Sequence, residues 1–328
     1  AGASAGDAGF AAALGERGRQ ADYATKALPG AALKVFSPEE ASAFKARMAQ
    51  GSDEDRVGLL GTMKATLSGG AYRAAVDQVF GDDPSARVAG RLASADIGLA
   101  RDVLRGAKLL DLPEMKDKGP ELREAIKRTM PRDLWPDVAT QDDAIRGAMA
   151  VYAAERGRQG LLYETPDRAG MERAMSRVAG EFTTRGGKQV AAPRGMPLSA
   201  FNGALNELTA SDLAPFGGAS WSADPKPGRD AEAIDPAWLS RNAGLIQLGL
   251  GESRYGVVIP LGGGRDAPVM TAAGKPLVID VAEIARRRNP APPRPADLGA
   301  TIEAQAPLGG ALELLAPSTK PGLAPAGF

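Results

Sequence analysis

The chain has 328 residues with equal numbers of basic and acidic residues, 40 of each, so its formal net charge is zero. Its hydrophobic content of 44% is enough for a sizeable core, and only 5% of the residues are aromatic. Histidine and cysteine are absent from the sequence, which excludes Ser-His-Asp and Cys-His catalysis, zinc sites built on these residues and disulfide bridges. Carboxylate chemistry, lysine chemistry or a non-catalytic role remain open.

The sequence gives no indication of a membrane-spanning or secretory segment. No apolar run reaches the roughly 18 residues that a membrane-spanning helix needs. Residues 1–9 lack the basic stretch followed by an apolar stretch that marks a secretory signal. The sequence begins with Ala1 instead of methionine, so we expect a processed product or a part of a longer chain.

The predicted elements begin with a helix over about residues 10–26, which Pro29 and Gly30 should stop. A capping box is expected at residues 37–40, Ser-Pro-Glu-Glu. The serine is the N-cap, the proline occupies the first helical position, and the second glutamate can reach back to the serine N–H. This pattern predicts a well-defined helix start.

A second capped helix is expected from Ser52. The acidic residues 53–55 lie at its positive N-terminal end, where they complement the helix dipole. Gly69 and Gly70 are expected to end this helix.

Six further helices are expected before residue 180. Four have recognisable starts, at Asp83-Pro84, Pro120, Thr140 and Thr165-Pro166. Their inward-facing residues recur at helical spacing, and they include Tyr72, Val76, Val79, Phe80, Val88, Leu92, Ile97, Ala100, Val103, Leu104, Leu122, Ile126, Ile145, Met149, Met171, Met175 and Val178. Short connections favour antiparallel helical hairpins. No repeat of fixed length is visible, so we expect an irregular array instead of a regular solenoid.

After Gly180 the sequence changes to turn-forming residues and short apolar runs. We expect first a short strand and turn over 186–195, a helix over 198–208, a loop over 214–230 and one helical turn from Asp235-Pro236. The strands expected after that are 245–250, 256–261, 269–270 and 277–281, with residues 251–254 joining the first two as a hairpin. The resulting antiparallel sheet should pack on the 198–208 helix.

These patterns predict a mainly α protein, in which an irregular array of antiparallel helical hairpins is followed by a small α+β unit with an antiparallel sheet. The expected organisation is a flexible or weakly helical N-terminal segment at 1–30, a helical domain at 31–180, a small α+β domain at 181–288 and a Pro/Ala/Gly-rich tail at 289–328.

Glu252-Ser253 is the strongest candidate for chemistry. Lytic transglycosylases use one glutamate as general acid and base, often followed by serine, and they need no histidine. That glutamate ends a helix at a groove, however, whereas Glu252 lies in a predicted hairpin turn. No Gly-rich, Gln-containing motif follows it. A polar turn residue is the better interpretation, and peptidoglycan cleavage stays open as an alternative.

The remaining polar motifs have structural explanations. Two Gly-containing segments do not match a phosphate-binding loop. Residues 180–188 lack the required spacing, and no helix is expected to follow the glycines at 262–264. The acidic residues that are adjacent in the sequence lie at expected helix starts, where they complement the helix dipole. They are residues 53–55, 82–83 and 142–143. Lysines 188, 226 and 275 are expected in turns, and tryptophans 135, 221 and 238 as packing or interface anchors.

The only dense basic run, Arg286–Arg288, is interpreted as a solvated helix end. Nucleic acid is a possible partner, but the charge pattern does not indicate that the protein binds it. We assign no catalytic, cofactor-binding or metal-binding residue, and no cofactor.

The stretch from about Gly186 to Val281 resembles a known class of protein. The residues that carry the resemblance are 187–190 (Gly-Lys-Gln-Val), 193–195 (Pro-Arg-Gly), the helix 196–212, Trp238-Leu239, 251–259 around Tyr255, and 274–280 (Gly-Lys-Pro-Leu-Val-Ile-Asp). They resemble the C-terminal region of large virion proteins of tailed bacteriophages and prophages, the internal or ejection proteins. The helical segment 37–110 is similar in character.

The resemblance implies a non-enzymatic virion component that aids genome delivery across the host envelope. Its implied partners are other virion proteins, such as portal, tail or ejection proteins, and further copies of itself. The implied location is the virion, and the host periplasm after ejection. Some proteins of this class carry a transglycosylase domain elsewhere in the chain, but none is visible in this sequence. A bacterial helical adaptor unrelated to phage is the other alternative.

Overall fold

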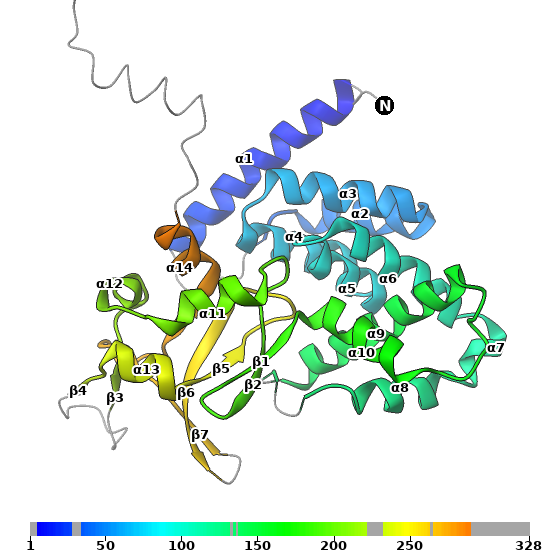
Figure 1. The fold of residues 1–328 in the computed structure, drawn as a ribbon. Helices are drawn as coiled ribbons and strands as arrows, with labels where there is room; N and C mark the ends of the chain where they lie inside the picture. Colours follow the sequence, from blue (N-terminus) through cyan, green and yellow to red (C-terminus); the bar gives the residue numbers. More distant parts are fainter. Residues whose placement is uncertain are drawn as a thin grey trace, which may run out of the picture. The chain divides into compact units, whose positions relative to one another are not determined.

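The computed structural model describes residues 5–27, 34–131, 134–135, 137–221, 232–262 and 265–289. The chain divides into a compact unit of residues 1–285 and a second unit of residues 286–328. The described residues are mainly helical, with a small antiparallel sheet after the helical array (Figure 1), which confirms the expected fold class. The stop expected at Pro29 and Gly30 and the tail beyond residue 289 lie outside these residues.

Ten helices precede the first strand within the described ranges. They are α1 (Ala5–Ala27), α2 (Pro38–Gln50), α3 (Asp53–Thr66), α4 (Gly69–Phe80), α5 (Pro84–Ala93), α6 (Ile97–Leu110), α7 (Pro113–Lys116), α8 (Gly119–Lys127), α9 (Val138–Arg158) and α10 (Arg168–Ala179). In the part of the chain that the structure describes, no helix is both long and apolar enough to cross a bilayer.

The predicted capping box at the start of α2 is confirmed. The Glu40 backbone N–H donates to the Ser37 hydroxyl, and the Ser37 N–H donates to the Glu40 carboxylate at 3.0 Å. Ser52 caps α3 in the same way, with Asp55 as the reciprocal acid. These starts could be predicted because the capping groups lie within four consecutive residues.

Glu40→Gln is expected to lower the free energy of unfolding by about 1 kcal/mol at neutral pH, and this effect should disappear as the pH falls through about 2. A hydrogen bond from Arg17, 2.5 Å from the carboxylate, and one from the Ser37 N–H lower the pKa of Glu40 from 4.5 to about 2. Because the pKa is lowered on folding, the stabilisation is present above about pH 4.5 and is lost as the pH falls toward 2. Urea unfolding across this range measures the effect. Glu54→Gln in the first turn of α3 is the control. An equal loss of unfolding free energy in both variants would contradict the stabilising role of the Glu40 hydrogen bonds.

Two predicted helix boundaries are wrong because a neighbouring residue provides the better cap. Asp137 caps α9 instead of Thr140, whose N–H donates to the Asp137 carboxylate at 2.7 Å. Asp167 caps α10 instead of Thr165, and its carboxylate accepts from the Gly170 N–H. Both helices therefore begin at residues other than those expected.

Gly69 and Gly70 were expected to end the second capped helix, and this prediction is also wrong. They open α4, because the Ser68 hydroxyl accepts from the Ala71 N–H and so caps a new helix. Glycine in a first helical turn lacks a side chain that would oppose this start.

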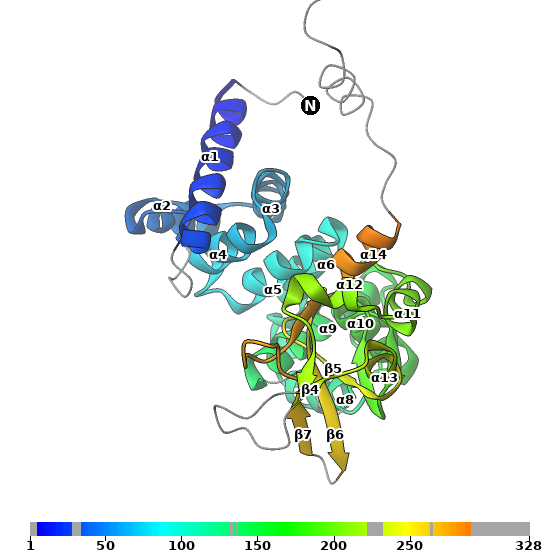
Figure 2. The same ribbon diagram turned by 90° about the vertical axis from the view of Figure 1, so that its left-hand side faces the viewer.

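The helices enclose a first hydrophobic core. α6 packs on α5 and α9, α10 packs on α9, and α1 packs on α3 and α4 (Figure 2). Most of the inward-facing residues expected from the sequence are buried here, among them Val76, Val88, Val103, Ile126 and Met175. Ile97 and Met149 pack against this core but are only partly buried. Small residues on α6 and α9 let these two helices approach closely, and a Cβ atom added at Gly106 would lie 1.7 Å from the Ala150 carbonyl oxygen.

The second half of the compact unit holds the strands. The elements are β1 (Phe182–Arg185), β2 (Lys188–Ala191), α11 (Leu198–Asn206), α12 (Ala210–Leu213), the short 3-10 helix η1 (Ala214–Phe216), β3 (Ser220–Trp221), β4 (Glu232–Ala233), α13 (Pro236–Asn242), β5 (Gly244–Gln247), β6 (Arg254–Gly262), β7 (Arg265–Pro268), β8 (Val278–Asp280) and α14 (Val281–Arg288). β6 pairs with β5, β7 and β8, all antiparallel.

The predicted hairpin of β5 and β6 is confirmed, and one strand prediction is wrong. The strand expected at 269–270 lies earlier, at β7, because β6 extends to Gly262 and its hairpin partner pairs from Arg265. Met270 forms only an isolated bridge with Pro276. The sequence therefore predicts the β5–β6 hairpin correctly but misplaces β7, the next strand of the sheet.

The sheet packs on α11, as expected. Phe201 of α11 and Tyr255 of β6 are both fully buried, with ring centroids 5.6 Å apart. Leu205, Val257 and Ile279 belong to the same second core. The aromatic pair fixes how the helix lies on the sheet.

Candidate functional site

The turn between β5 and β6 joins the two cores. Leu250 in this turn is 4% exposed and belongs to the core of the helical array, although its flanking strands belong to the sheet. Ala191 at the end of β2 contributes to the same core. The turn is therefore anchored in the helices by an apolar side chain at its tip.

A buried hydrogen-bond network lies beside this turn. The Trp135 indole donates to the Gln247 side-chain oxygen at 3.0 Å, and the Gln247 amide donates to the Glu252 backbone carbonyl at 2.9 Å. The Tyr255 hydroxyl donates to the Ala191 carbonyl at 2.7 Å. Gln247 is fully buried, so these partners satisfy polar groups that would otherwise be costly to bury. The network fixes the β5–β6 turn against the segment that holds Trp135.

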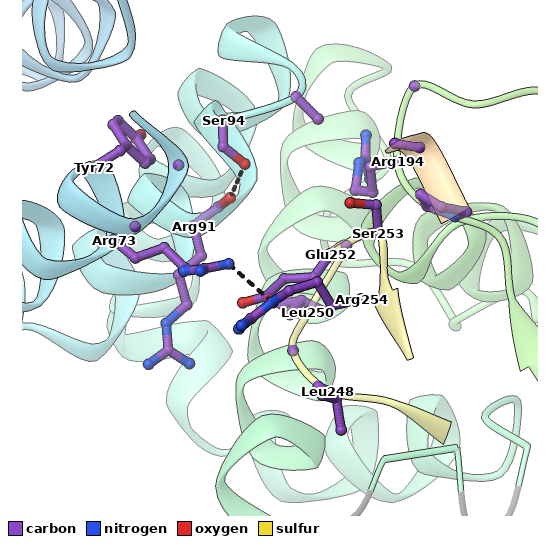
Figure 3. Close-up of a pocket in the computed structure, with 18 of the residues that line it drawn as sticks. Tyr72, Arg73, Arg91, Ser94, Arg194, Leu248, Leu250, Glu252, Ser253 and Arg254 are labelled. Atoms are coloured by element: carbon purple, nitrogen blue, oxygen red, sulfur yellow. Dashed lines mark hydrogen bonds and ion pairs between the residues drawn. The ribbon is translucent and has the colours of Figure 1, made fainter. Parts of the chain in front are cut away.

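Glu252, the catalytic candidate of the sequence analysis, lies in the hairpin turn as predicted. Its Oε2 atom is 2.9 Å from Nη1 of Arg73 on α4 and 3.1 Å from Nη2 of Arg254 on β6 (Figure 3). Its side chain is 18% exposed. One carboxylate oxygen therefore holds two guanidinium groups, one of them more than a hundred residues away in the sequence.

A pocket of about 910 Å³ opens at this junction. One wall comes from α4 and α5 and carries Arg73 and Arg91, and the other carries Arg194 and Ser253 (Figure 3). Five basic and three acidic residues line it, namely Lys64, Arg73, Arg91, Arg194 and Arg254 against Asp77, Glu252 and Asp280. The lining thus carries an excess of positive charge although the whole chain is neutral.

Arg194 is the most unusual side chain of this pocket. It is 10% exposed, and its ion pair with Asp96 spans 3.8 Å, beyond hydrogen-bond distance. Its buried Nε and Nη1 atoms have no hydrogen-bond partner among the described residues. Burial lowers the pKa of Arg194 to about 10, and the group therefore stays charged at neutral pH.

The structure corrects the interpretation of two charged motifs. Lys188 was expected in an unburied turn, but it lies in β2 with a side chain 15% exposed and paired with Asp266. Asp143 was expected at a helix start, but α9 begins five residues earlier, at Val138. The Asp143 carboxylate is instead buried in an ion pair with two arginines of α5. Among the described residues no acidic cluster is arranged to hold a metal ion.

The tryptophans have different environments. Trp135 is buried in the network described above, as expected for a packing residue, and Trp238 is 38% exposed on α13. The side chain of Trp221, the position of Lys226 and part of the 262–264 glycine run lie outside the described residues.

No motif in the sequence indicates that Arg73, Arg91 and Arg194 belong to one site. The segments that carry them come together only through tertiary packing. The local sequence does not show which arginine will be buried in the folded protein.

No family model matches the chain, and no curated protein or solved structure matches it.

Proposed function

We propose that the protein is a non-enzymatic assembly component of a tailed-bacteriophage virion, an internal or ejection protein that contacts other virion proteins and further copies of itself. The observation that carries the non-enzymatic part is the environment of Glu252. Its Oε2 atom is bound by Arg73 and Arg254 and helps to join the helices to the sheet. A general acid must deliver a proton to its substrate, and this oxygen is already committed to two cations.

The virion setting is supported by the resemblance of residues 186–281. The physical properties of the chain agree with that role. Without cysteine, no disulfide closes a loop that would resist threading through a narrow channel. Small helical hairpins can open locally at a lower free-energy cost than the whole fold.

The virion assignment is tested by mass spectrometry of purified, DNA-filled particles from a strain that carries the gene. We expect peptides from this chain in the particles at a stoichiometry comparable with known minor structural proteins. Their absence would overturn the virion setting and favour a bacterial helical adaptor. Portal, capsid and terminase genes beside this gene are also expected.

Glu252→Gln tests the enzymatic alternative. We expect neither the native protein nor the variant to reduce the turbidity of a peptidoglycan suspension, because Glu252 acts as an ion-pair anchor. The variant should instead lose about 1 kcal/mol of unfolding free energy, since it weakens two partly exposed ion pairs. Glu172→Gln on α10, whose ion pair with Arg168 stays within one helix, is the matched control. Clearing by the native protein that disappears in Glu252→Gln would establish a peptidoglycan-cleaving function.

A further inference from the structure

We propose that the pocket between α4, α5 and the β5–β6 turn binds a small organic anion, and that Arg194 holds its carboxylate or phosphate group. This site is separate from the assembly role proposed above and does not depend on it.

The first support is the incomplete pairing of the Arg194 guanidinium. Nε and Nη1 lack any acceptor among the described residues, and the single ion pair, with Asp96, is 3.8 Å long. Asp96 is itself 49% exposed, and its carboxylate already accepts from the Gly98 and Leu99 N–H groups as the cap of α6. A buried charge without acceptors is costly, so its retention needs an explanation. An anionic oxygen bound in the pocket supplies one.

The second support is the way the backbone positions this side chain. The Arg194 N–H donates to the Gly251 carbonyl at 3.3 Å. A Cβ atom at Gly251 would lie 2.7 Å from the Arg194 Cγ atom, so the glycine leaves room for the aliphatic stem. Gly251 also has a φ of +71°, which disfavours other residues. The turn therefore fixes the backbone and the aliphatic stem of Arg194, so that only its guanidinium end has to rotate when a ligand binds.

The third support is the charge of the surrounding wall. Glu252 is shared by Arg73 and Arg254, so this trio keeps one positive charge. Lys64 has no carboxylate partner among the described residues, and its ammonium group contacts only the Ala95 carbonyl, at 3.5 Å. A pocket with unmatched cations attracts anions and disfavours metal ions.

The size of the pocket indicates a small molecule. About 910 Å³ lies within the range of ordinary ligand sites, about 300–1,000 Å³. Leu67, Met196 and Leu248 add apolar surface for the organic part of the ligand. The Nε and Nη1 atoms are shielded from solvent, so the guanidinium must turn toward the pocket as the anion binds, through rotation about its side-chain torsions.

Isothermal titration calorimetry at low ionic strength tests the site with two probes, citrate for a carboxylate and glucose 6-phosphate for a phosphate, with glucose as the neutral control. We expect saturable binding of at least one anion, and its identity distinguishes the two ligand chemistries. Arg194→Gln should weaken this binding at least about tenfold. Arg101→Gln, an exposed arginine of α6 outside the pocket, should leave it unchanged.

Thermal unfolding of the ligand-free variants separates lost binding from lost folding. Arg194→Gln removes an incompletely paired buried charge, so we expect its midpoint to equal or exceed that of the native protein. If this variant fails to fold, Arg194→Lys keeps the charge without the planar fork and should still bind more weakly. Absence of saturable binding by both anions, or equal binding by the native protein and an Arg194 variant, would overturn the proposal.

Discussion

Gly106→Ala is expected to lower the free energy of unfolding by at least about 2 kcal/mol, because the added methyl group has no room between α6 and α9. It would lie 1.7 Å from the Ala150 carbonyl oxygen and 2.9 Å from its Cα atom. Both are backbone atoms of α9, so relief requires a shift of the whole helix. Alanine favours a helix over glycine by about 1 kcal/mol, and this gain is too small to offset such a clash.

Gly58→Ala on α3 is the matched control. It also lies within a helix and is exposed, and apart from its chain neighbours and the adjacent backbone of its own helix no described atom lies within 4 Å of the position that the added methyl group would take. We expect it to raise the free energy of unfolding by about 0.5–1 kcal/mol through helix propensity and a less flexible unfolded chain. Urea unfolding followed by far-UV circular dichroism measures both variants. Similar effects at the two positions would contradict the close packing of α6 on α9.

Local chemistry explains which parts of the fold could be predicted from the sequence. The capping box at Ser37 and the hairpin of β5 and β6 depend on neighbouring residues, and both predictions are confirmed. Thr140 was mistaken for a cap because both it and Asp137 are good N-cap residues. The sequence alone does not show that the Asp137 carboxylate accepts from the Thr140 N–H.

The candidate site depends on contacts that no local pattern contains. Arg73 and Glu252 approach to 2.9 Å from opposite halves of the compact unit. Leu250 leaves the core of its own sheet and enters that of the helices. Gly251 and Glu252 could be predicted to lie in a turn. The residues that they contact could not be predicted, because tertiary packing brings those residues to the turn. The virion role rests on resemblance and stays a prediction.

Asp143→Asn is expected to lower the free energy of unfolding by about 3 kcal/mol, because it leaves two arginines without their shared carboxylate. The Asp143 side chain is 3% exposed, and its two oxygens lie 2.9 Å from Arg87 Nη2 and 2.7 Å from Arg91 Nη1. Arg87 has no other carboxylate partner among the described residues, and its Nε is already unpaired. The ion pair joins α5 to α9, and both helices contribute to the first core, so its loss should destabilise that core.

Asp142→Asn, one residue earlier on α9, is the matched control. It distinguishes loss of the Asp143 ion pair from loss of a negative charge near the N-terminus of α9. Asp142 is 48% exposed and pairs with Arg123 on α8 at 2.5 Å. Solvent screens this pair, so we expect a loss of less than about 1 kcal/mol. Both substitutions remove one negative charge from adjacent positions of the same helix, so an effect of the helix dipole would be nearly equal in the two variants. Urea unfolding of the two proteins distinguishes these causes. A loss for Asp143→Asn no larger than that for Asp142→Asn would show that the buried ion pair does not stabilise the array, and the α5–α9 contact would then depend on apolar packing alone.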